Sequence, residues 1–382
     1  MCIAGVGMTA FGRHLDSRLS DLAGQAAMAA IEHAQADVKD VDLVVMANSM
    51  AGILQDQESV RGQVALAGGP FAGKPLVNVE NACASSSSAV QVASWALLGG
   101  AARSVLVVGV EKLFHSDKTA TFRALASASD APKTAENRSM FMDFYAGRAR
   151  DHMREYGTTL EQLAAVSVKN RGHGELNPLA QFRQQVALED VLNSRLIVDP
   201  LTLLMCSPVS DGAAAVLLRL RRDLASGAPT VAIRGLGLSS GDSKGPEYET
   251  IRRTATAAYQ AAGLTARNVD VAEVHDATSI AEIEACEALG LAERGEGGAL
   301  VQSGASGLHG RVPVNPSGGL LSRGHPVAAS GAAQLAELTW QLRGEAGARQ
   351  VSNAVVAVAE NHGGLVGNDV AVAAVTILER VA

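Results

Sequence analysis

The sequence predicts an α/β protein built from two similar halves. CIAGVG (2–7) is a β-branched run ending in Gly-x-Gly, and AIRGLG (232–237) repeats it. Each run is followed by an Ala-rich helical stretch and then by a second apolar run, VDLVVMAN (41–48) or VDVAEVHD (269–276). Strands that alternate with helices in this way predict βαβ units with right-handed crossovers, and hence mostly parallel sheets covered by helices.

Two further pairs of segments support the duplication. A turn-helix-strand unit runs from Asn81 to SVLVVGVEK (104–112), and its counterpart runs from Asn315 to NAVVAVAEN (353–361). Because the pairs occur in the same order at nearly constant spacing, we interpret them as a true internal repeat. Each half then closes with a β-rich run: DGAAAVLLRL (211–220) and NDVAVAAVTIL (368–378).

Residues 113–200 have no counterpart in the second half. We therefore predict a first half of residues 1–112 plus 201–222, an insertion of residues 113–200, and a second half of residues 229–382. An insertion of this kind fits a lid that covers the substrate, or alternatively a packing or dimerisation segment. It holds more than half of the aromatic residues of the chain: Phe114, Phe122, Phe141, Phe144, Tyr145, Tyr156 and Phe182.

Composition excludes several classes of function. The formal net charge is −7, so no general basic field exists to hold nucleic acid. The uncharged stretch 81–102 is long enough to cross a membrane, but its Asn, Ser and Gln residues favour a helix buried inside the protein. We find no targeting signal and expect a cytoplasmic protein without a membrane span.

The four cysteines are scattered along the chain. Cys2, Cys83, Cys206 and Cys286 show no CxxC spacing, which argues against a disulfide framework and a thiolate zinc site. We expect no metal, because no cluster of His, Cys or carboxylate residues has ligand spacing. Cys206 and Cys286 are predicted to be structural.

Cys83 is the candidate nucleophile. It begins the uncharged helix in VENACASSSSAV, directly after the strand-like PLVNVE. A helix N-terminus presents free N–H groups and a partial positive charge, so we expect it to lower the pKa of this thiol and to hold an oxyanion at the attacked carbon. Taken alone, a cysteine in such a stretch is more often a small buried hydrophobe, so the assignment depends on its context.

His325 is the candidate base. It lies in VNPSGGLLSRGHPVAASGAAQ, at the position of the second half that corresponds to the Cys83 region. Gly318, Gly319 and Gly324 allow tight turns there, and Pro326 can open the following helix. An imidazole held between Gly and Pro on such a loop is suited to general base catalysis.

These motifs resemble the thiolase superfamily along the whole chain. NACASSSSA (81–89) is similar to the nucleophile loop of that family, NPSGGLLSRGHP (315–326) to its histidine loop, and PLTLLMCSPVSDGAAAVLL (200–218) to the loop before the last strand of the first half. SVKNRGHGELNPLAQF (167–182) resembles the sterol-carrier-protein-type branch, which acts on fatty or branched acyl-CoA. The resemblance implies a duplicated βαβαβαββ core, with two packed mixed sheets in an α-β-α-β-α layering, an inserted loop domain and four catalytic loops at the centre.

The resemblance also assigns the loops of the second half. EVHDATSIAEI (273–283) matches the His-Asp motif of the sterol-carrier-type branch, which implies that His275 helps to hold a thioester oxygen. In AVAENHGGLVG (357–367) Asn361 stands where ordinary thiolases have a second, acid/base cysteine. Sterol-carrier-type members have that cysteine directly after His-Asp, where this chain has Ala277. Neither position retains the thiol.

Three residues are candidate substitutes for the missing acid/base group: Glu360, His362 and His275. His362 is favoured because Gly363 and Gly364 follow it directly. Glu360 corresponds to a glutamate of the first half and can instead serve to close a strand end. Backbone N–H groups near Cys83 and Gly363 are expected to form the oxyanion site.

The implied function is that of a thiolase-type acyltransferase. It would form an acyl-enzyme on Cys83 and make or cleave a carbon–carbon bond next to a thioester. Coenzyme A thioesters would be substrates, with CoA or an acyl-carrier thioester as acceptor and no permanently bound cofactor. We expect the anionic head of CoA to bind to the insertion (113–200) and the chain to form at least a homodimer.

Two alternatives keep the fold and change the function. The first is a thiolase-fold aldolase or condensing enzyme completed by a small zinc-ribbon OB-fold partner of the DUF35 type, as found for bacterial thiolase-like proteins that lack the second cysteine. The second is a lipid-binding homologue without catalysis. Acylation of Cys83 would distinguish the acyltransferase and the aldolase or condensing enzyme from the non-catalytic lipid-binding homologue.

Overall fold

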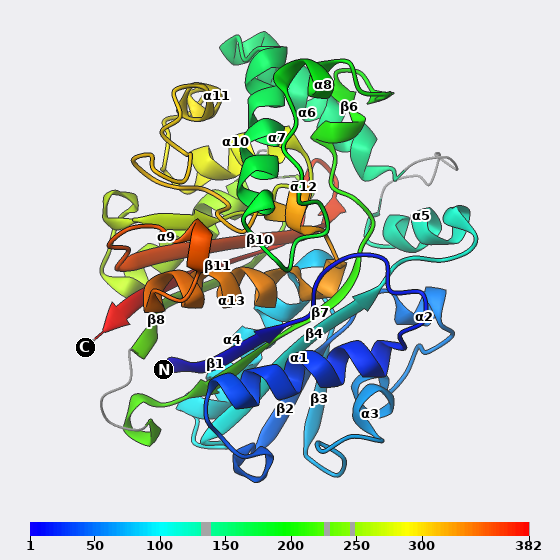
Figure 1. Ribbon diagram of the computed structural model, residues 1–382, viewed down its shortest axis with the longest axis vertical. Coiled ribbons are helices and arrows are strands. Elements are labelled where there is room, and N and C mark those ends of the chain that lie inside the picture. Colours follow the sequence, from blue (N-terminus) through cyan, green and yellow to red (C-terminus); the bar gives the residue numbers. More distant parts are fainter. Residues whose placement is uncertain (131–138, 225–229, 245–248, 382) are drawn as a thin grey trace.

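The computed structural model describes residues 1–130, 139–224, 230–244 and 249–381. It confirms the α/β class: strands from both halves form a mixed sheet with helices on both sides (Figure 1). Residues 131–138 of the predicted insertion, and residues 229 and 382 at the ends of the predicted second half, lie outside the described residues. No helix of the described segments is long and apolar enough to cross a membrane.

The first half forms five strands in the order β3-β2-β4-β7-β1. β2 runs parallel to β3 and β4, whereas β7 runs antiparallel to both β4 and β1. Its elements are β1 (Cys2–Met8), α1 (Leu19–His33), β2 (Leu43–Ala47), α2 (Ala51–Leu54), α3 (Arg61–Leu66), β3 (Leu76–Val79), α4 (Ser85–Leu98), β4 (Ser104–Lys112) and β7 (Asp211–Arg219).

The second half repeats this topology. β11 lies antiparallel between β8 and β10, and β10 runs parallel to β9. Val314 forms a parallel bridge with Ala272 of β9, in the place that β3 takes beside β2. The predicted duplication is therefore confirmed. The elements are β8 (Thr230–Ser240), α9 (Glu249–Ala262), β9 (Val271–Glu273), α10 (Ser279–Ala288), α11 (Gly297–Gln302), α12 (Gly319–Arg323), α13 (Ser330–Arg343), β10 (Val356–Val366) and β11 (Asp369–Val381).

The two halves enclose a shared apolar core. α4 and α13 contact each other between the sheets, and α13 packs against strands of both halves. α1 covers the outer face of the first sheet and α9 that of the second, which gives the expected α-β-α-β-α layering (Figure 1). Two separate sheets were expected, but Cys2 and Ile3 of β1 pair with β8 and join them into one nine-stranded sheet within the described residues.

Matching glycines set the distance between strand and helix in both halves. A side chain at Gly5 or Gly7 of β1 would overlap backbone carbonyl oxygens of α1. Gly235 and Gly237 of β8 meet α9 in the same way. The repeated Gly-x-Gly therefore marks a close approach of backbone to backbone rather than a turn.

The insertion forms a helical layer over the second half. Its α6 and α7 share an apolar cluster with α10 and α12, so it packs beside the histidine loop at the top of Figure 1. Its described elements are α5 (Lys118–Ala126), α6 (Phe141–Tyr156), α7 (Leu160–Glu175), α8 (Leu188–Leu192) and β5 (Leu196–Val198), which pairs with β6 (Leu201–Thr202).

Substitutions of glycines near α1 test this packing. Gly5→Ala should lower the free energy of unfolding by about 1 to 3 kcal/mol, because the new Cβ overlaps the carbonyl of Ala30 and forces α1 outward. Gly24→Ala, inside α1 with open space around its Cβ position, is the matched control and should raise stability by about 0.5 to 1 kcal/mol. Urea titration measures the free energy of unfolding of each variant. Equal stabilities of the two variants would contradict the close packing of β1 against α1.

Candidate active site

One apolar cavity collects most of the predicted site residues. It has a volume of about 380 Å³ and lies between the insertion and the two halves. Asn361 and Glu360 do not line it. The other predicted residues do, so the fold brings together segments far apart in the sequence. The predicted residues on its wall are Cys83, His275, His325, His362 and Gly363.

Cys83 sits in a tight turn directly before α4. The turn is a single 3-10 segment (Ala82–Ala84), in which Ala82 has a left-handed φ of 48°. Left-handed backbone is unfavourable for residues with a Cβ, so surrounding contacts must hold it. One of them is a hydrogen bond of 2.7 Å from the Ala82 N–H to the Glu80 carboxylate. The turn places the half-buried Cys83 on the cavity wall.

The Cys83 thiol is not ionised in the free protein. Burial raises its pKa to about 12, and the nearby negative charges of Glu111 and Glu80 raise it further. Hydrogen bonds from the N–H groups of Cys83 and Gly364 act in the opposite direction. The expected depression of this pKa by the helix N-terminus is therefore wrong, because desolvation of the thiolate outweighs the dipole.

His325 is oriented as a proton acceptor. Its ring Nδ1 lies 2.8 Å from the hydroxyl of Ser330, which itself donates to the carbonyl of Pro326. The hydroxyl therefore accepts from Nδ1–H, and this assigns the free lone pair to Nε2. Burial lowers the pKa of His325 to about 3, with help from the positive charge of Arg323, so the resting imidazole is neutral. Neutral imidazole is the form that a general base requires.

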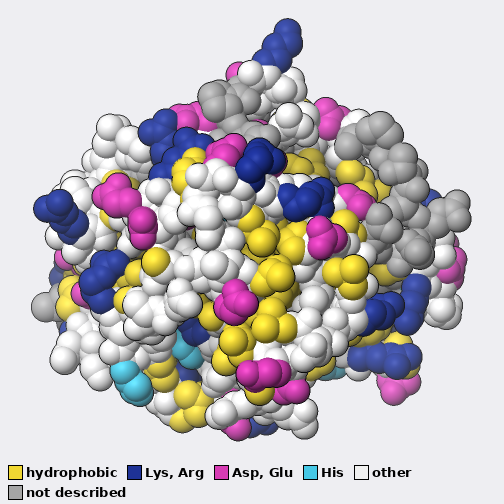
Figure 2. Space-filling model, turned by 90° about the horizontal axis from the view of Figure 1, so that it is seen from above, with side chains coloured by type: hydrophobic (Ala, Val, Ile, Leu, Met, Phe, Trp, Pro, Cys, Tyr) yellow, Lys and Arg dark blue, Asp and Glu magenta, His cyan; other side chains and the backbone are white. Residues whose placement is uncertain are grey.

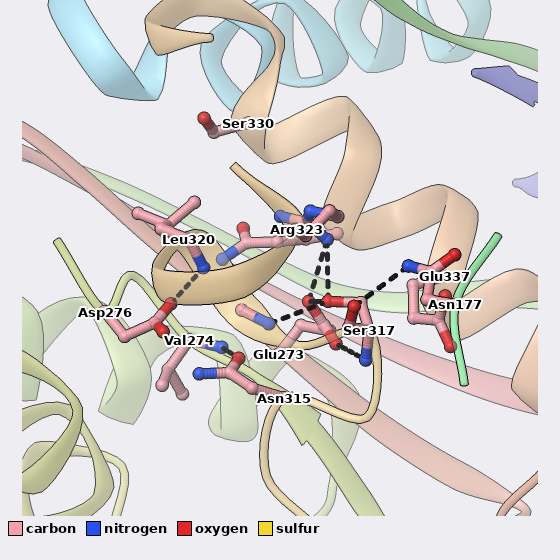
Figure 3. Close-up of polar contacts among 12 residues, drawn as sticks. Asn177, Glu273, Val274, Asp276, Asn315, Ser317, Leu320, Arg323, Ser330 and Glu337 are labelled. Carbon is pink, nitrogen blue, oxygen red and sulfur yellow. Dashed lines mark hydrogen bonds and ion pairs between the residues drawn. The ribbon is translucent and has the colours of Figure 1, made fainter. Parts of the chain in front are cut away.

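A buried polar network holds the histidine loop (Figure 3). Arg323, only 1% exposed, forms an ion pair of 2.9 Å with Glu273 and a hydrogen bond to Ser317. Asp276 accepts from the N–H of Leu320 at 2.6 Å, which fixes the start of α12. Gly319 has a φ of 59°, and a side chain there would contact the Asp276 carboxylate. The aspartate of the His-Asp motif therefore positions the loop that carries His325.

His275 is oriented as a hydrogen-bond donor. The side-chain amide of Asn361 lies 3.0 Å from its Nδ1, and the oxygen of that amide accepts from Ser87. The amide nitrogen therefore donates to Nδ1, which assigns the proton of His275 to Nε2. Burial lowers the pKa of His275 well below its usual value. A neutral imidazole with Nε2–H suits an oxyanion site.

His362 belongs to a chain of polar groups that the sequence did not reveal. Its Nδ1 lies 2.8 Å from the carboxylate of Glu360, and its Nε2 lies 3.1 Å from the hydroxyl of Tyr145. Glu360 also accepts the backbone N–H of His275 at 3.0 Å. Tyr145 comes from α6 of the insertion and lines the cavity.

The residues from Glu360 to Gly364 lie on a strand. β10 pairs with β11 along this stretch, so the predicted loop is wrong: the long β11 continues the ladder past His362. Gly363 lies against the nucleophile turn, where a Cβ would come 2.6 Å from the Cys83 nitrogen. It therefore lets the strand approach the turn, whereas the Gly364 N–H is the one that reaches the sulfur.

Two further residues bear on the missing acid/base thiol. Ala277 lines the cavity and provides no polar group. Cys206, predicted to be structural, also lines the cavity, and burial raises the pKa of its thiol to about 12. Cys286, the other cysteine predicted to be structural, is fully buried.

Three donor atoms in the cavity lie unexpectedly close together. One atom each of Cys83, His275 and His325 falls within 4.8 Å of the others, although the sequence spacing predicted no such cluster. The same closeness is what a thiol nucleophile needs from a base and an oxyanion donor.

The insertion supplies the outer wall of the cavity. Its apolar side chains Phe122, Phe141, Met142 and Ile197 line the wall, and Arg195 adds a charge there. Figure 2 views the molecule from the insertion side and shows a band of hydrophobic side chains with both basic and acidic side chains around it. An acyl chain and an anionic head group are the kinds of ligand that this combination suits.

Alkylation of Cys83 tests its resting state. Because the neutral thiol is unreactive, the rate with iodoacetamide should rise about tenfold per pH unit between pH 7 and pH 10. Peptide mass spectrometry assigns the labelled cysteine and gives the rate at each pH. A plateau below pH 8 would mean instead that Cys83 and His325 rest as an ion pair.

Comparison with known proteins fits this geometry. The thiolase N-terminal domain model matches residues 1–222, and a model described as thiolase C-terminal domain-like matches residues 239–380. An acetyl-CoA acetyltransferase of Methanothermobacter thermautotrophicus is 41% identical and covers 100% of this chain and 99% of its own.

Two more distant relatives agree. Human sterol carrier protein 2 is 35% identical over 94% of this chain and 69% of its own length. The solved structure of an Ltp2-ChsH2(DUF35) aldolase has a TM-score of 0.81 at 25% identity and covers 99% of this chain and 97% of its own. The chain therefore belongs to the thiolase family of acyltransferases.

Proposed function

We propose that this chain accepts an acyl group from a coenzyme A thioester on Cys83 and then makes or cleaves a carbon–carbon bond next to a thioester carbonyl. The observation that carries the proposal is the placement of the Cys83 thiol within 4.8 Å of the His275 and His325 rings on the wall of an apolar cavity. A thiol, a base and a hydrogen-bond donor are the groups that acyl transfer requires.

Acylation begins with proton transfer from Cys83 to His325. Because the thiol is neutral at rest, its proton moves to Nε2 of His325 as the sulfur attacks the thioester carbonyl. Backbone N–H groups near Cys83 and Gly363 stabilise the oxyanion. Loss of the CoA thiolate, which takes up a proton from solvent, leaves the acyl group on the sulfur and His325 protonated.

The carbon–carbon step uses the other imidazoles. Nε2–H of His275 and the protonated His325 hold the oxygen of the enolate. His362 is proposed to take part in proton transfer at the α-carbon, since Asn361 and Ala277 provide no thiol. The anionic head of CoA binds to the insertion, and the acyl chain lies among its apolar side chains.

The absent acid/base thiol favours one alternative. The aldolase that this chain resembles carries a DUF35 component, so a small OB-fold partner could complete the site of this chain as well. This alternative predicts weak turnover for the isolated chain and at least about a tenfold gain on co-expression with such a partner. It leaves the acylation of Cys83 unchanged.

The surface supports a homodimer. β3 is the outermost strand of the first sheet, and its Val77 is exposed. Trp95 and Leu98 of α4, which contacts β3, are 60% and 69% exposed. Exposed large apolar side chains beside an unpaired strand edge are typical of a subunit contact.

The proposed domain limits at residues 112, 200 and 229 remain predictions.

Intact mass measurement tests the acyl-enzyme. Incubation with acetyl-CoA should add one acetyl group to the protein, and Cys83→Ala should abolish the addition because Cys83 is the thiol that lies beside the His275 and His325 rings. Cys286→Ala is the control and should remain fully acetylated. Full acetylation of the Cys83 variant would reject the assignment.

Two histidine variants test the roles assigned to His325 in acylation and to His362 in the carbon–carbon step. His325→Ala should slow acetylation by about 100-fold, because the neutral thiol then lacks its base. His362→Ala should leave acetylation within about twofold and impair only the carbon–carbon step. Quenched acetylation assays followed by mass spectrometry measure the acetylation rate of each variant. Equal losses of acetylation in the two variants would contradict the assigned roles.

A paired surface substitution tests the dimer. Trp95→Glu with Leu98→Glu should give a monomer, because burial of two charges at the contact is unfavourable. Light scattering coupled to size-exclusion chromatography measures the mass. The control Leu15→Glu, at an exposed position between β1 and α1, should leave the assembly unchanged. A monomeric wild type would contradict the proposed contact.

A further inference from the structure

The cavity contains a phenol that neither the sequence motifs nor the proposed function employs. Tyr145 is 3% exposed, and its hydroxyl lies 3.1 Å from Nε2 of His362. Its ring packs edge to face against Phe144. Three residues further along α6, Arg148 forms an ion pair of 2.7 Å with Glu284 of α10. Packing on both sides therefore holds this hydroxyl in place.

The hydrogen bonds define a direction for proton transfer. Nδ1 of His362 lies 2.8 Å from the carboxylate of Glu360, which has no proton to donate when ionised. Nδ1 must therefore carry the proton, which leaves a lone pair on Nε2 to accept from the hydroxyl of Tyr145. The result is a chain of hydrogen bonds that runs from Tyr145 in the cavity, through His362, to the fully buried carboxylate of Glu360.

This arrangement also limits what His362 can do alone. The lone pair of Nε2 points at the Tyr145 hydroxyl, and Nδ1–H points at Glu360. Neither ring nitrogen is free to take a proton from carbon while both hydrogen bonds exist. The phenol oxygen keeps lone pairs that no hydrogen bond of the described residues occupies, and Tyr145 lines the same cavity as Cys83.

We propose that the hydroxyl of Tyr145 is the acid/base group that exchanges a proton with the α-carbon of the thioester, with His362 and Glu360 as its relay. This inference rests on the proposed function and replaces direct action of His362. It assigns the task of the missing cysteine to the insertion rather than to the two catalytic halves.

The step balances in protons and electrons. The α-carbon–hydrogen bond breaks as its proton moves to the oxygen of Tyr145, and the proton of the phenol moves to Nε2 of His362. The electron pair left on carbon becomes the enolate, whose oxygen accepts hydrogen bonds from His275 and His325. Glu360 stabilises the imidazolium formed at His362. Reversal of the same transfers protonates the carbon after bond cleavage.

The electrostatics of the site favour this concerted transfer. Burial raises the pKa of Tyr145 well above its usual value, and the negative charges of Glu360 and Glu284 raise it further. The phenol therefore remains protonated at neutral pH. It can take a proton from carbon only while it passes its own proton to His362.

Exchange of hydrogen for deuterium on the acetyl group tests the relay. Acetyl-CoA is incubated with each protein in D₂O, and mass spectrometry follows deuterium entering the methyl group. Tyr145→Phe should reduce this exchange by at least about 100-fold, because the ring remains but the hydroxyl is lost. Acetylation of Cys83 should stay within about twofold. Tyr259→Phe, which removes a partly buried hydroxyl that donates to the carbonyl of Leu289, is the matched control and should exchange normally.

A double variant separates the relay from a structural role. If Tyr145 and His362 act in one chain, Tyr145→Phe with His362→Gln should exchange no more slowly than the slower single variant. Wild-type exchange in Tyr145→Phe, multiplicative losses in the double variant, or no exchange in a wild type that is acetylated on Cys83 would each overturn the relay. Failure of wild-type acetylation would instead reject the proposed function.

Discussion

The close approach of α4 and α13 is the constraint on which the site depends. Each helix begins after a single 3-10 turn, and the two starts meet between the sheets. Gly331 lies so near Ser87 that a Cβ would overlap its hydroxyl, and the N–H of Ala332 donates to Ser86 at 2.9 Å. Small residues on both helices allow this contact. It is the reason that Cys83 and His325, from different halves, face one cavity.

A buried carboxylate in each half supports the loops of the site. Glu111 accepts the N–H of Met50 in the first half at 3.1 Å and the N–H of Ala328 at the start of the second-half helix. Glu360 has the corresponding role in the second half, where its carboxylate accepts the backbone N–H of His275. Glu111 is fully buried, and burial raises its pKa to about 7. The repeat therefore duplicates the supports of the loops, whereas the chemistry differs between the halves: a thiol in one and imidazoles in the other.

Sequence reasoning succeeds here where the signal is local. The Gly-x-Gly runs, the strand pattern and the histidine loop are short motifs, so the duplicated fold and the placement of Cys83, His275 and His325 could be predicted. Tyr145 could not, because it is one aromatic residue on a helix of the insertion, 217 positions away from His362 in the chain. The ionisation of Cys83 was predicted with the wrong sign for a related reason. Its pKa depends on a balance between the helix start and burial, and burial is a property of the whole fold.

The most direct test places one methyl group between the two helices. Gly331→Ala pushes α13 away from Ser87 of α4, and a shift of roughly 1 Å in the reacting groups is enough to slow a positioned reaction about 100-fold. We predict that the single-turnover rate of acetyl transfer from acetyl-CoA to Cys83 falls by about that factor while the thermal unfolding transition remains cooperative. Ser87→Ala in the same chain should restore part of the rate by making room. Acetylation of a folded Gly331→Ala variant at the wild-type rate would contradict the account.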